Sequence, residues 1–262
     1  MNPADVPVVI LCGGLGTRLR EETEARPKPM VEIGHAPILW HVMKLYSHHG
    51  FRRFILCLGY RSEVIKEFFR NFEHWRRDLT VDFSNGSRPH LGGPSPEEWR
   101  ITLAETGRDT MTGGRIQRIQ QYITGDVFMA TYGDGLADID LAAELRFHLA
   151  HGKAATLAAV TPVSRFGVLD VRADGSIAHF REKPILEERV NGGFYVFNRS
   201  VFDYLTPDCV LEEQPMRQLA ENDLLMAYRH PGAFYCMDTY RDYLSLNKLW
   251  DDHEARWKLW DD

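Results

Sequence analysis

The sequence predicts an α/β fold in which a mostly parallel sheet is flanked by helices. Strand-like apolar runs alternate with helix-like segments along the first half of the chain, which is the pattern of a parallel sheet covered on both faces. The chain has 262 residues, of which 44% are hydrophobic, enough for one large domain with a substantial core. The first apolar run, residues 6–12, ends in a glycine-rich turn. We therefore expect a buried first strand that leads into a ligand-binding loop.

The remaining elements of the first half follow from apolar spacing and from end signals. Pro37 suits the first turn of a helix that Gly50 can end, and Ser62 can cap a helix with one apolar stripe. Thr112 can cap another. A loop at 85–96 holds three Gly, three Pro and two Ser, so it is either a mobile lid over a ligand or a surface insertion. The expected strands are 6–12, 51–59, 101–105 and 127–132, and the expected helices are 37–50, 62–72 and 112–123.

The second half is predicted to add a short antiparallel part and a C-terminal helix. Its expected strands are 154–161, 166–171 paired with 177–184 through a turn at 174–175, 194–197 and 224–228; its expected helices are 140–152 capped by Asp140, 201–205, 212–222 and 240–262. His148 and His151 are interpreted as a solvated helix end. Trp250, Trp257 and Trp260 recur along one helix face, which would pack on the chain's own body or form a subunit interface.

The glycine-rich turn predicts a cradle for a nucleoside triphosphate. Gly13, Gly14 and Gly16 allow consecutive backbone N–H groups to face an anion. Arg18 adds positive charge, and Lys28 lies between two prolines that hold it in a stiff extended segment. A dinucleotide fingerprint would need glycine at position 19 and a P-loop would need lysine after Gly16, so neither motif fits. An ordinary tight turn remains the alternative.

Two further groups of polar residues lie where a ligand could meet them. Asp134 follows the strand 127–132, at the strand end where open parallel sheets bind ligands, and carboxylates are preferred ligands of Mg²⁺. A simple Asp-Gly turn is the alternative there, and a helix cap is the alternative for Asp238. Arg115 lies near the positive end of a helix dipole, which suggests a role other than surface charge, although a surface position remains open.

Composition and charge exclude several classes of protein. The net charge of −6 argues against a nucleic-acid partner. No apolar run approaches the roughly 20 residues that span a bilayer, so we expect no membrane association. The four cysteines are far apart and contain no Cys-x-x-Cys pair, which is typical of buried free thiols in a reducing compartment. We therefore expect a cytoplasmic protein.

At this point the residues carry a resemblance to a known family. Gly-Gly-x-Gly-Thr-Arg-Leu at 13–19, Lys-Pro-Met at 28–30 and the nearby Glu32 are similar to the signature of the sugar-phosphate nucleotidylyltransferases. Residues 21–23, 28–34 and 37–41 resemble its glucose-1-phosphate cytidylyltransferase branch most, apart from Cys12, His35 and the loop 85–96. The resemblance implies a single nucleotidylyltransferase domain over 1–262 with a Rossmann-like, mixed, mostly parallel sheet. It divides into a nucleotide-binding half (about 1–140), a sugar-phosphate-binding half with a small β part (about 141–240) and a C-terminal helix (about 240–262).

The same resemblance implies an activity. It implies transfer from CTP to a sugar-1-phosphate, α-D-glucose 1-phosphate in this branch, giving CDP-glucose and pyrophosphate in a homo-oligomer. Another nucleotide or sugar, or a non-catalytic regulatory module, are the alternatives; a dinucleotide oxidoreductase is disfavoured by Leu19. The implied residues are Arg18, Lys28 and Asp134 for catalysis; Leu11, Cys12, Gly13, Gly14, Gly16, Thr17, Thr110, Arg115 and Gly133 for the nucleotide; Glu182, Lys183, Asn191 and Gly192 for the sugar phosphate; and Asp134 and Asp238 for Mg²⁺.

Overall fold

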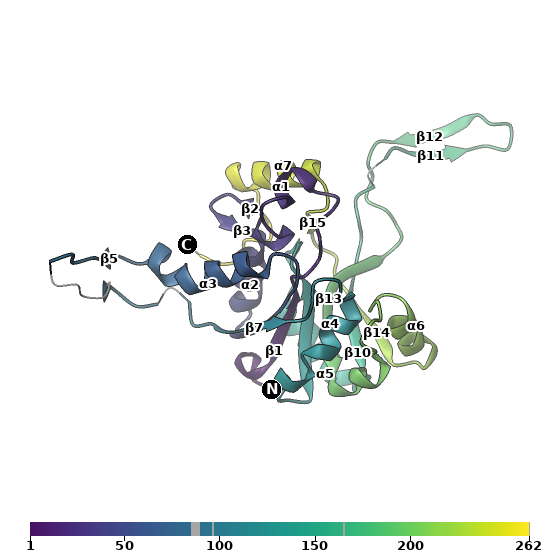
Figure 1. Cartoon of the computed structure of the whole chain (residues 1–262). Coiled ribbons are helices and arrows are strands. Elements are labelled where there is room, and N and C mark those ends of the chain that lie inside the picture. Colours follow the sequence, from purple (N-terminus) through teal and green to yellow (C-terminus); the bar gives the residue numbers. More distant parts are fainter. Residues whose placement is uncertain (85–89, 96, 165, 262) are drawn as a thin grey trace.

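A seven-stranded sheet runs through the centre of the computed structural model, which describes residues 1–84, 90–95, 97–164 and 166–261 (Figure 1). The strand order is β14-β10-β13-β8-β1-β4-β7. Parallel pairs join β1 to β4 and β8, β4 to β7, and β10 to β14, whereas β13 is antiparallel to both β8 and β10. The predicted mixed, mostly parallel sheet is therefore confirmed. The strands are β1 (Pro7–Leu11), β4 (Arg53–Leu58), β7 (Arg100–Glu105), β8 (Val127–Tyr132), β10 (Ala155–Val160), β13 (Val190–Asn198) and β14 (Leu225–Arg229).

Helices cover both faces of this sheet. Alternate residues of β1 point to opposite faces, so that Val8 and Ile10 join one apolar cluster and Val9 and Leu11 join another. Helices α2 (Ile38–His48), α3 (Ser62–Arg76) and α5 (Leu141–His151) contribute buried side chains to the first cluster. Helices α4 (Thr112–Arg118) and α6 (Gln214–Glu221) contribute to the second. Burial on both faces explains why a central strand such as β1 is a continuous apolar run.

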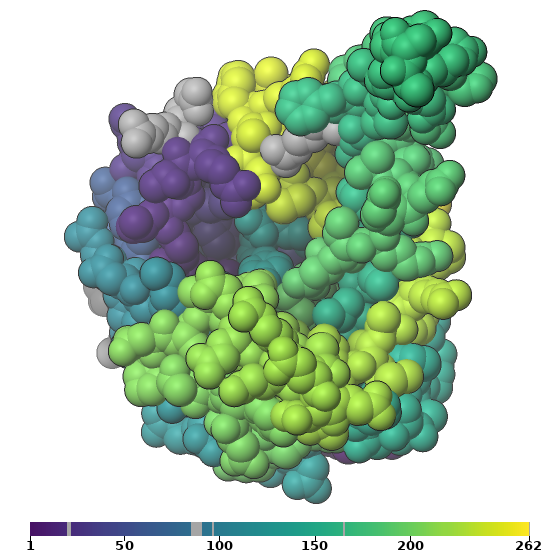
Figure 2. Space-filling view, turned by 90° about the vertical axis from the view of Figure 1, so that its right-hand side faces the viewer, coloured from purple at the N-terminus to yellow at the C-terminus, as the bar shows by residue number. Residues whose placement is uncertain are grey.

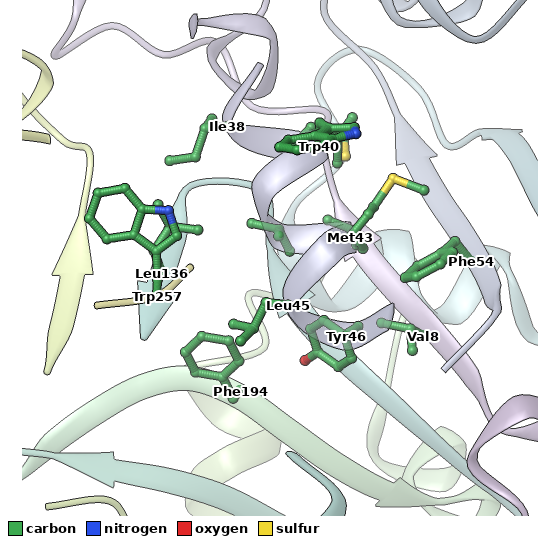
Figure 3. Close-up of a cluster of buried hydrophobic side chains, with 14 of the residues drawn as sticks. Val8, Ile38, Trp40, Met43, Leu45, Tyr46, Phe54, Leu136, Phe194 and Trp257 are labelled. Carbon is green, nitrogen blue, oxygen red and sulfur yellow. The ribbon is translucent and has the colours of Figure 1, made fainter. Parts of the chain in front are cut away.

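Helix α2 is the centre of the larger cluster. Eight of its eleven residues are buried, and Trp40, Met43 and Tyr46 lie among side chains from several strands (Figure 3). Phe194 on β13 and Trp257 near the C-terminus join the same cluster. Residues from both halves of the chain therefore share one core.

The C-terminal helix is shorter than predicted. Helix α7 (Tyr240–Asp251) opens with a capping box between Thr239 and Asp242 and ends well before residue 262. His253 has a φ of 61°, and the chain continues through turns. Trp257 is fully buried and Trp260 nearly so. The prediction of one helix face was therefore wrong, but packing of these tryptophans on the chain's own body is confirmed.

A hairpin stands away from the body of the molecule. It consists of β11 (Val168–Val171) and β12 (Ile177–Arg181), which are antiparallel and turn through Gly175 at a φ of 84°, as predicted (Figure 1). Leu169 pairs with Phe180 and Val171 with Ile177, and all four side chains are exposed. The hairpin therefore presents paired apolar side chains to solvent.

The smaller elements complete the fold. The loop predicted at 85–96, as a mobile lid or a surface insertion, lies partly outside the described residues, at 85–89 and 96. Within its described part, His90–Leu91 form a short strand. The elements are α1 (Arg20–Thr23), β2 (Glu32–Ile33), β3 (Ala36–Pro37), β5 (Leu79–Thr80), β6 (His90–Leu91), β9 (Gly135–Ala137), β15 (Phe234–Cys236) and the 3₁₀ helices Pro3–Asp5, Lys28–Met30, Gln120–Tyr122 and Arg199–Tyr204.

Several helix ends differ from expectation. Asp140 caps α5 as predicted, because its Oδ1 accepts from the Ala143 N–H at 2.8 Å. Ser62 and Thr112 are the first residues of their helices rather than caps, and α4 ends at Arg118 instead of continuing to 123. Residues 201–205, predicted to be α-helical, lie mostly within the 3₁₀ helix Arg199–Tyr204.

His148 also departs from its predicted environment. It is fully buried at the end of α5, and its ring contacts the Thr156 hydroxyl at 2.9 Å and Asn198 Oδ1 at 3.2 Å. The interpretation as a solvated helix end was therefore wrong for this residue. His151, partly exposed, reaches the same hydroxyl at 2.7 Å.

The described residues contain no helix with the length and apolar character needed to cross a bilayer. All four cysteines are free thiols, as predicted, with Cys12 and Cys57 buried and Cys209 and Cys236 partly so.

Candidate active site

The glycine loop and Asp134 meet at one edge of the sheet. The loop follows β1 and Asp134 follows β8, and these two strands are parallel neighbours, so their carboxyl ends lie side by side. A cavity of about 370 Å³ opens there, in a hollow between N-terminal residues (purple) and C-terminal residues (yellow) (Figure 2). Its lining includes all of the predicted catalytic, nucleotide-binding and metal residues: Leu11, Cys12, Gly13, Gly14, Gly16, Thr17, Arg18, Lys28, Thr110, Arg115, Gly133, Asp134 and Asp238.

The three glycines of the loop serve different purposes. Gly16 has a φ of +63°, a conformation that other residues rarely adopt. A Cβ on Gly13 would lie 2.1 Å from Arg115 Nη1, so this position has no room for a side chain. A Cβ on Gly14 would meet nothing within 4 Å. The space beside Gly14 is therefore open for a ligand that approaches the backbone.

The side chain of Arg115 holds the glycine loop in place through hydrogen bonds. Its side chain is buried, so the alternative of a surface residue was wrong. Its guanidinium donates to the carbonyl oxygens of Gly13 (3.0 Å), Leu58 (3.0 Å) and Gly107 (2.7 Å), with further bonds to the Arg108 carbonyl and the Thr106 hydroxyl. All five acceptors are neutral, and burial lowers the pKa of Arg115 below its usual value. The guanidinium thus fixes the loop and places positive charge beneath it.

Lys28 lies between the two predicted metal carboxylates. Its Nζ donates to Asp134 Oδ2 at 2.5 Å and to Asp238 Oδ1 at 2.8 Å, and Arg18 Nη1 reaches Asp238 Oδ2 at 3.0 Å. Burial lowers the pKa of Lys28, but Asp134 and Asp238 more than offset this and raise it above its usual value. Its stem lies close to the loop, because a Cβ added to Gly16 would be only 3.3 Å from Lys28 Cβ. One ammonium thus holds both acids beside the glycine turn.

Asp238 reaches this point through a small antiparallel pair. Strand β15 pairs with β9, which places Cys236 opposite Gly135, and the Met237 N–H donates to the Asp134 carbonyl at 3.1 Å. Two acids separated by 104 positions thereby converge, and with Cys236 they form a group whose potential ligand atoms all lie within 4.8 Å of one another. The alternative of a helix cap was wrong, because Thr239 caps α7.

Comparisons with known proteins identify the family of this chain. The family model described as nucleotidyl transferase matches residues 7–260. This chain belongs to the nucleotidyl transferase family. Glucose-1-phosphate cytidylyltransferase of Salmonella typhimurium is 49% identical over 256 residues, covering 97% of this chain and 99% of that protein. Probable glucose-1-phosphate cytidylyltransferase of Bacillus subtilis is 46% identical over 254 residues, covering 96% and 99%.

A solved structure has the same fold as this nucleotidyl transferase. A putative glucose-1-phosphate thymidylyltransferase from Bacillus anthracis superposes with a TM-score of 0.69 at 16% identity, covering 98% of each chain. The resemblance noted in the sequence is therefore confirmed at the level of the family and of its glucose-1-phosphate cytidylyltransferase relatives.

The predicted sugar-phosphate residues of this nucleotidyl transferase lie outside the cavity lining. Glu182 and Lys183 form an exposed ion pair with 3.5 Å between Nζ and Oε1, next to the hairpin strand β12. Asn191 and Gly192 lie near the start of β13, and Gly192 is buried against Val160. The roles of these four residues stay predictions.

Sequence reasoning did not assign to the site four residues that line the cavity, Pro29, Met111, Thr112 and Tyr132, nor Glu212 beside it. Tyr132, the last residue of β8, lines the cavity, and its hydroxyl donates to Glu212 Oε1. Its place at a strand end beside Asp134 was a signal that could have found it. Glu212 lay within an expected helix, and its sequence neighbours give no indication of this contact.

A larger cavity of about 720 Å³ lies elsewhere, against Trp40, Trp250 and Trp260. It shares no lining residue with the first cavity, and Lys44 and Glu97 form an ion pair of 3.0 Å at its wall. The converging acids, the lysine and the glycine turn are all in the smaller cavity, which we take as the candidate active site.

Proposed function

We propose that the protein transfers a cytidylyl group from CTP to α-D-glucose 1-phosphate, giving CDP-glucose and pyrophosphate. The strongest support is the identity of 46–49% to glucose-1-phosphate cytidylyltransferases across nearly the whole chain. The cavity adds support, because it combines an open glycine turn, two cations and two carboxylates. A non-catalytic regulatory module has less support, since such a protein has no need to keep Arg18, Lys28 and both acids in contact.

The proposed reaction is a single in-line displacement. A phosphate oxygen of the sugar phosphate forms a bond to the α-phosphorus of CTP, and the bond to the β-phosphate oxygen breaks as pyrophosphate leaves with the electron pair. Such a transfer depends on positioning and charge neutralisation more than on a protein nucleophile. The N–H groups at the loop of Gly13, Gly14 and Gly16 would hold the triphosphate, Lys28 would donate to oxygens around the reacting phosphorus, and the exposed Arg18 would neutralise the departing pyrophosphate.

We further propose Mg²⁺ as the cofactor, held by Asp134 and Asp238. The donor set fits, because both carboxylates converge on one point and Mg²⁺ prefers one or two such oxygens together with substrate phosphates. Cys236 adds a sulfur that suits softer metals, and burial, with smaller effects of Asp134 and Asp238, raises the pKa of its thiol to about 12, so it stays protonated. Bound there, the ion would neutralise phosphate charge. Lys28 neutralises the same two acids in the structure and would turn toward the phosphates when substrate binds.

We propose that the chain works as a homo-oligomer, with the hairpin as its contact. A two-stranded hairpin alone is marginally stable in water. Leu169, Val171, Ile177 and Phe180 are 46–63% exposed on it, and a second copy would cover them. Light scattering on the wild-type protein and on Phe180→Glu would test this, since loss of the oligomer is expected in the variant. A monomeric wild-type protein would refute it.

We also propose that the enzyme works in the cytoplasm. Its four cysteines are free thiols, which a reducing compartment maintains.

The activity is tested by a substrate panel. Each of CTP, UTP, GTP and dTTP is incubated with glucose 1-phosphate, and pyrophosphate release is followed. We expect CTP to be used with a kcat/KM well above that of the other three. Faster turnover of another nucleotide would transfer the proposal to that base, and no release with any of the four nucleotides would refute transfer to glucose 1-phosphate.

A further inference from the structure

A chain of hydrogen bonds runs from Asn191 to the carboxylate of Glu212. Asn191 Nδ2 donates to the Tyr195 hydroxyl at 2.5 Å, the Tyr195 and Tyr132 hydroxyls are 2.9 Å apart, and the Tyr132 hydroxyl donates to Glu212 Oε1. A phenol has one O–H group, and that of Tyr132 donates its hydrogen bond to the carboxylate. Tyr195 must therefore donate to Tyr132. Every bond of the chain therefore has a fixed direction, set by the carboxylate at its end.

The direction of this chain fixes the amide of Asn191. Its Nδ2 donates to Tyr195, and its Oδ1 accepts from the Gly193 N–H at 2.9 Å. One N–H and one lone pair of the amide remain for other contacts. Burial raises the pKa of Tyr132, and Tyr195 and Glu212 raise it further, so this phenol stays a donor. The amide is thus held in one orientation.

The second oxygen of the Glu212 carboxylate contacts the start of α4, on the nucleotide side of the site. Glu212 Oε2 accepts from the Thr112 hydroxyl at 2.7 Å, and the Thr112 hydroxyl accepts from the Leu211 N–H at 2.9 Å. Thr112 is the first residue of α4 and lines the cavity, whereas Asn191 lies on β13 in the other half of the chain. One carboxylate therefore connects the two halves.

We infer that Glu212 is a positioning residue that sets the Asn191 amide on the sugar side and the start of α4 on the nucleotide side together. The inference rests on the proposed function, because it takes Asn191 as a contact of the sugar phosphate. Glu212 itself does not line the cavity, so it acts through Tyr132, Tyr195 and Thr112.

The test is the variant Glu212→Gln. It keeps the shape but replaces one acceptor oxygen by a donor NH₂, which faces the proton of Tyr132 or of Thr112 and forces one bond to break or reverse. We expect the KM for glucose 1-phosphate to rise about tenfold, as for loss of one hydrogen bond to a charged group, with a smaller change in kcat. Glu213→Gln, at the adjacent exposed glutamate outside this chain of bonds, is the matched control and should resemble wild type.

A second background separates positioning from general damage. In an Asn191→Ala protein the amide is absent, so adding Glu212→Gln should leave the KM for the sugar phosphate unchanged. A merely structural role of Glu212 would lower activity further in that background. If Glu212→Gln fails to fold, Tyr132→Phe breaks the same chain and is measured in the same two backgrounds.

The outcomes are distinct. A sugar-phosphate KM within twofold of wild type in both Glu212→Gln and Tyr132→Phe, or additive effects with Asn191→Ala, overturns the inference. Absence of turnover by the wild-type protein with CTP refutes the proposed function instead.

Discussion

Replacing Lys28 by methionine tests the central charge of the site. Methionine matches the lysine stem as far as Cε but lacks the ammonium that lies 2.5 Å from Asp134 Oδ2 and 2.8 Å from Asp238 Oδ1. Two opposite results are expected. Turnover should fall, because a donor to the reacting phosphates is lost, whereas binding of a divalent cation without nucleotide should become tighter, because the ammonium no longer competes for the same two carboxylates.

The magnitude follows from the type of contact. Loss of one preorganised donor to developing negative charge costs about 2.7–4 kcal/mol, which is roughly 10²–10³ in kcat. Only 13% of the Lys28 side chain is exposed, so solvent screens it little. The Thr23 hydroxyl lies 3.0 Å from the Gly16 carbonyl and 2.8 Å from the Leu19 carbonyl and can share its one proton between them, so the loop should keep its shape in the variant.

Pyrophosphate release at saturating CTP and glucose 1-phosphate measures the loss in turnover, and Mn²⁺ titration by electron paramagnetic resonance measures cation binding. Lys153→Met is the matched control. Lys153 forms a 2.7 Å ion pair with Asp223, and neither residue lines the cavity. Undiminished turnover in Lys28→Met would refute its role in catalysis. Unchanged or weaker Mn²⁺ binding would show that the ammonium and the cation do not share one position.

Three further predictions follow from the geometry. Gly13→Ala should lower both the melting temperature and the CTP affinity, because its Cβ would collide with Arg115, whereas Gly14→Ala should melt like wild type yet bind CTP more weakly. Scanning calorimetry and isothermal titration measure these two properties, and equal melting temperatures of the two variants would contradict the prediction. Burial raises the pKa of the Glu144 carboxyl to about 8 from 4.5, so its contribution to stability is full at low pH and is lost as pH rises between these values. Between roughly pH 5.5 and pH 8, the free energy of unfolding of wild type should fall by about 3 kcal/mol relative to that of Glu144→Gln, as measured by urea unfolding. Parallel pH profiles of the two proteins would refute this. Asp238→Asn should raise the Mg²⁺ concentration for half-maximal turnover about tenfold, while chelation by EDTA should stop turnover in wild type and added Mg²⁺ restore it; full activity in EDTA would exclude the cofactor.

The position of the site could be predicted from the sequence because it depends on the ends of strands. Runs of apolar residues identified β1 and β8, and the turns after them carry Gly13 and Asp134, so parallel pairing brought these residues together. Lys28 was found because its flanking prolines restrict the backbone. Each of these features depends on residues that are close together in the sequence, so it can be recognised without knowledge of the tertiary structure.

Tertiary contacts could not be predicted in the same way. The spacing of Trp250, Trp257 and Trp260 imitates a helix, yet Trp257 is buried because the chain turns near His253 and reaches the core by another path. Burial of His148 depends on Thr156 and Asn198, which belong to different strands. No periodicity encodes a contact of this kind.

The guanidinium of Arg115 also constrains how this sequence can change. It fills the space that a Cβ at Gly13 or at Gly59 would enter, at 2.1 and 2.6 Å from Nη1. Shortening Arg115 alone would remove the guanidinium from all five oxygens that it contacts, and a side chain at either glycine alone would collide with the guanidinium. An engineer who transplants this loop into another scaffold must therefore move all three positions as one block.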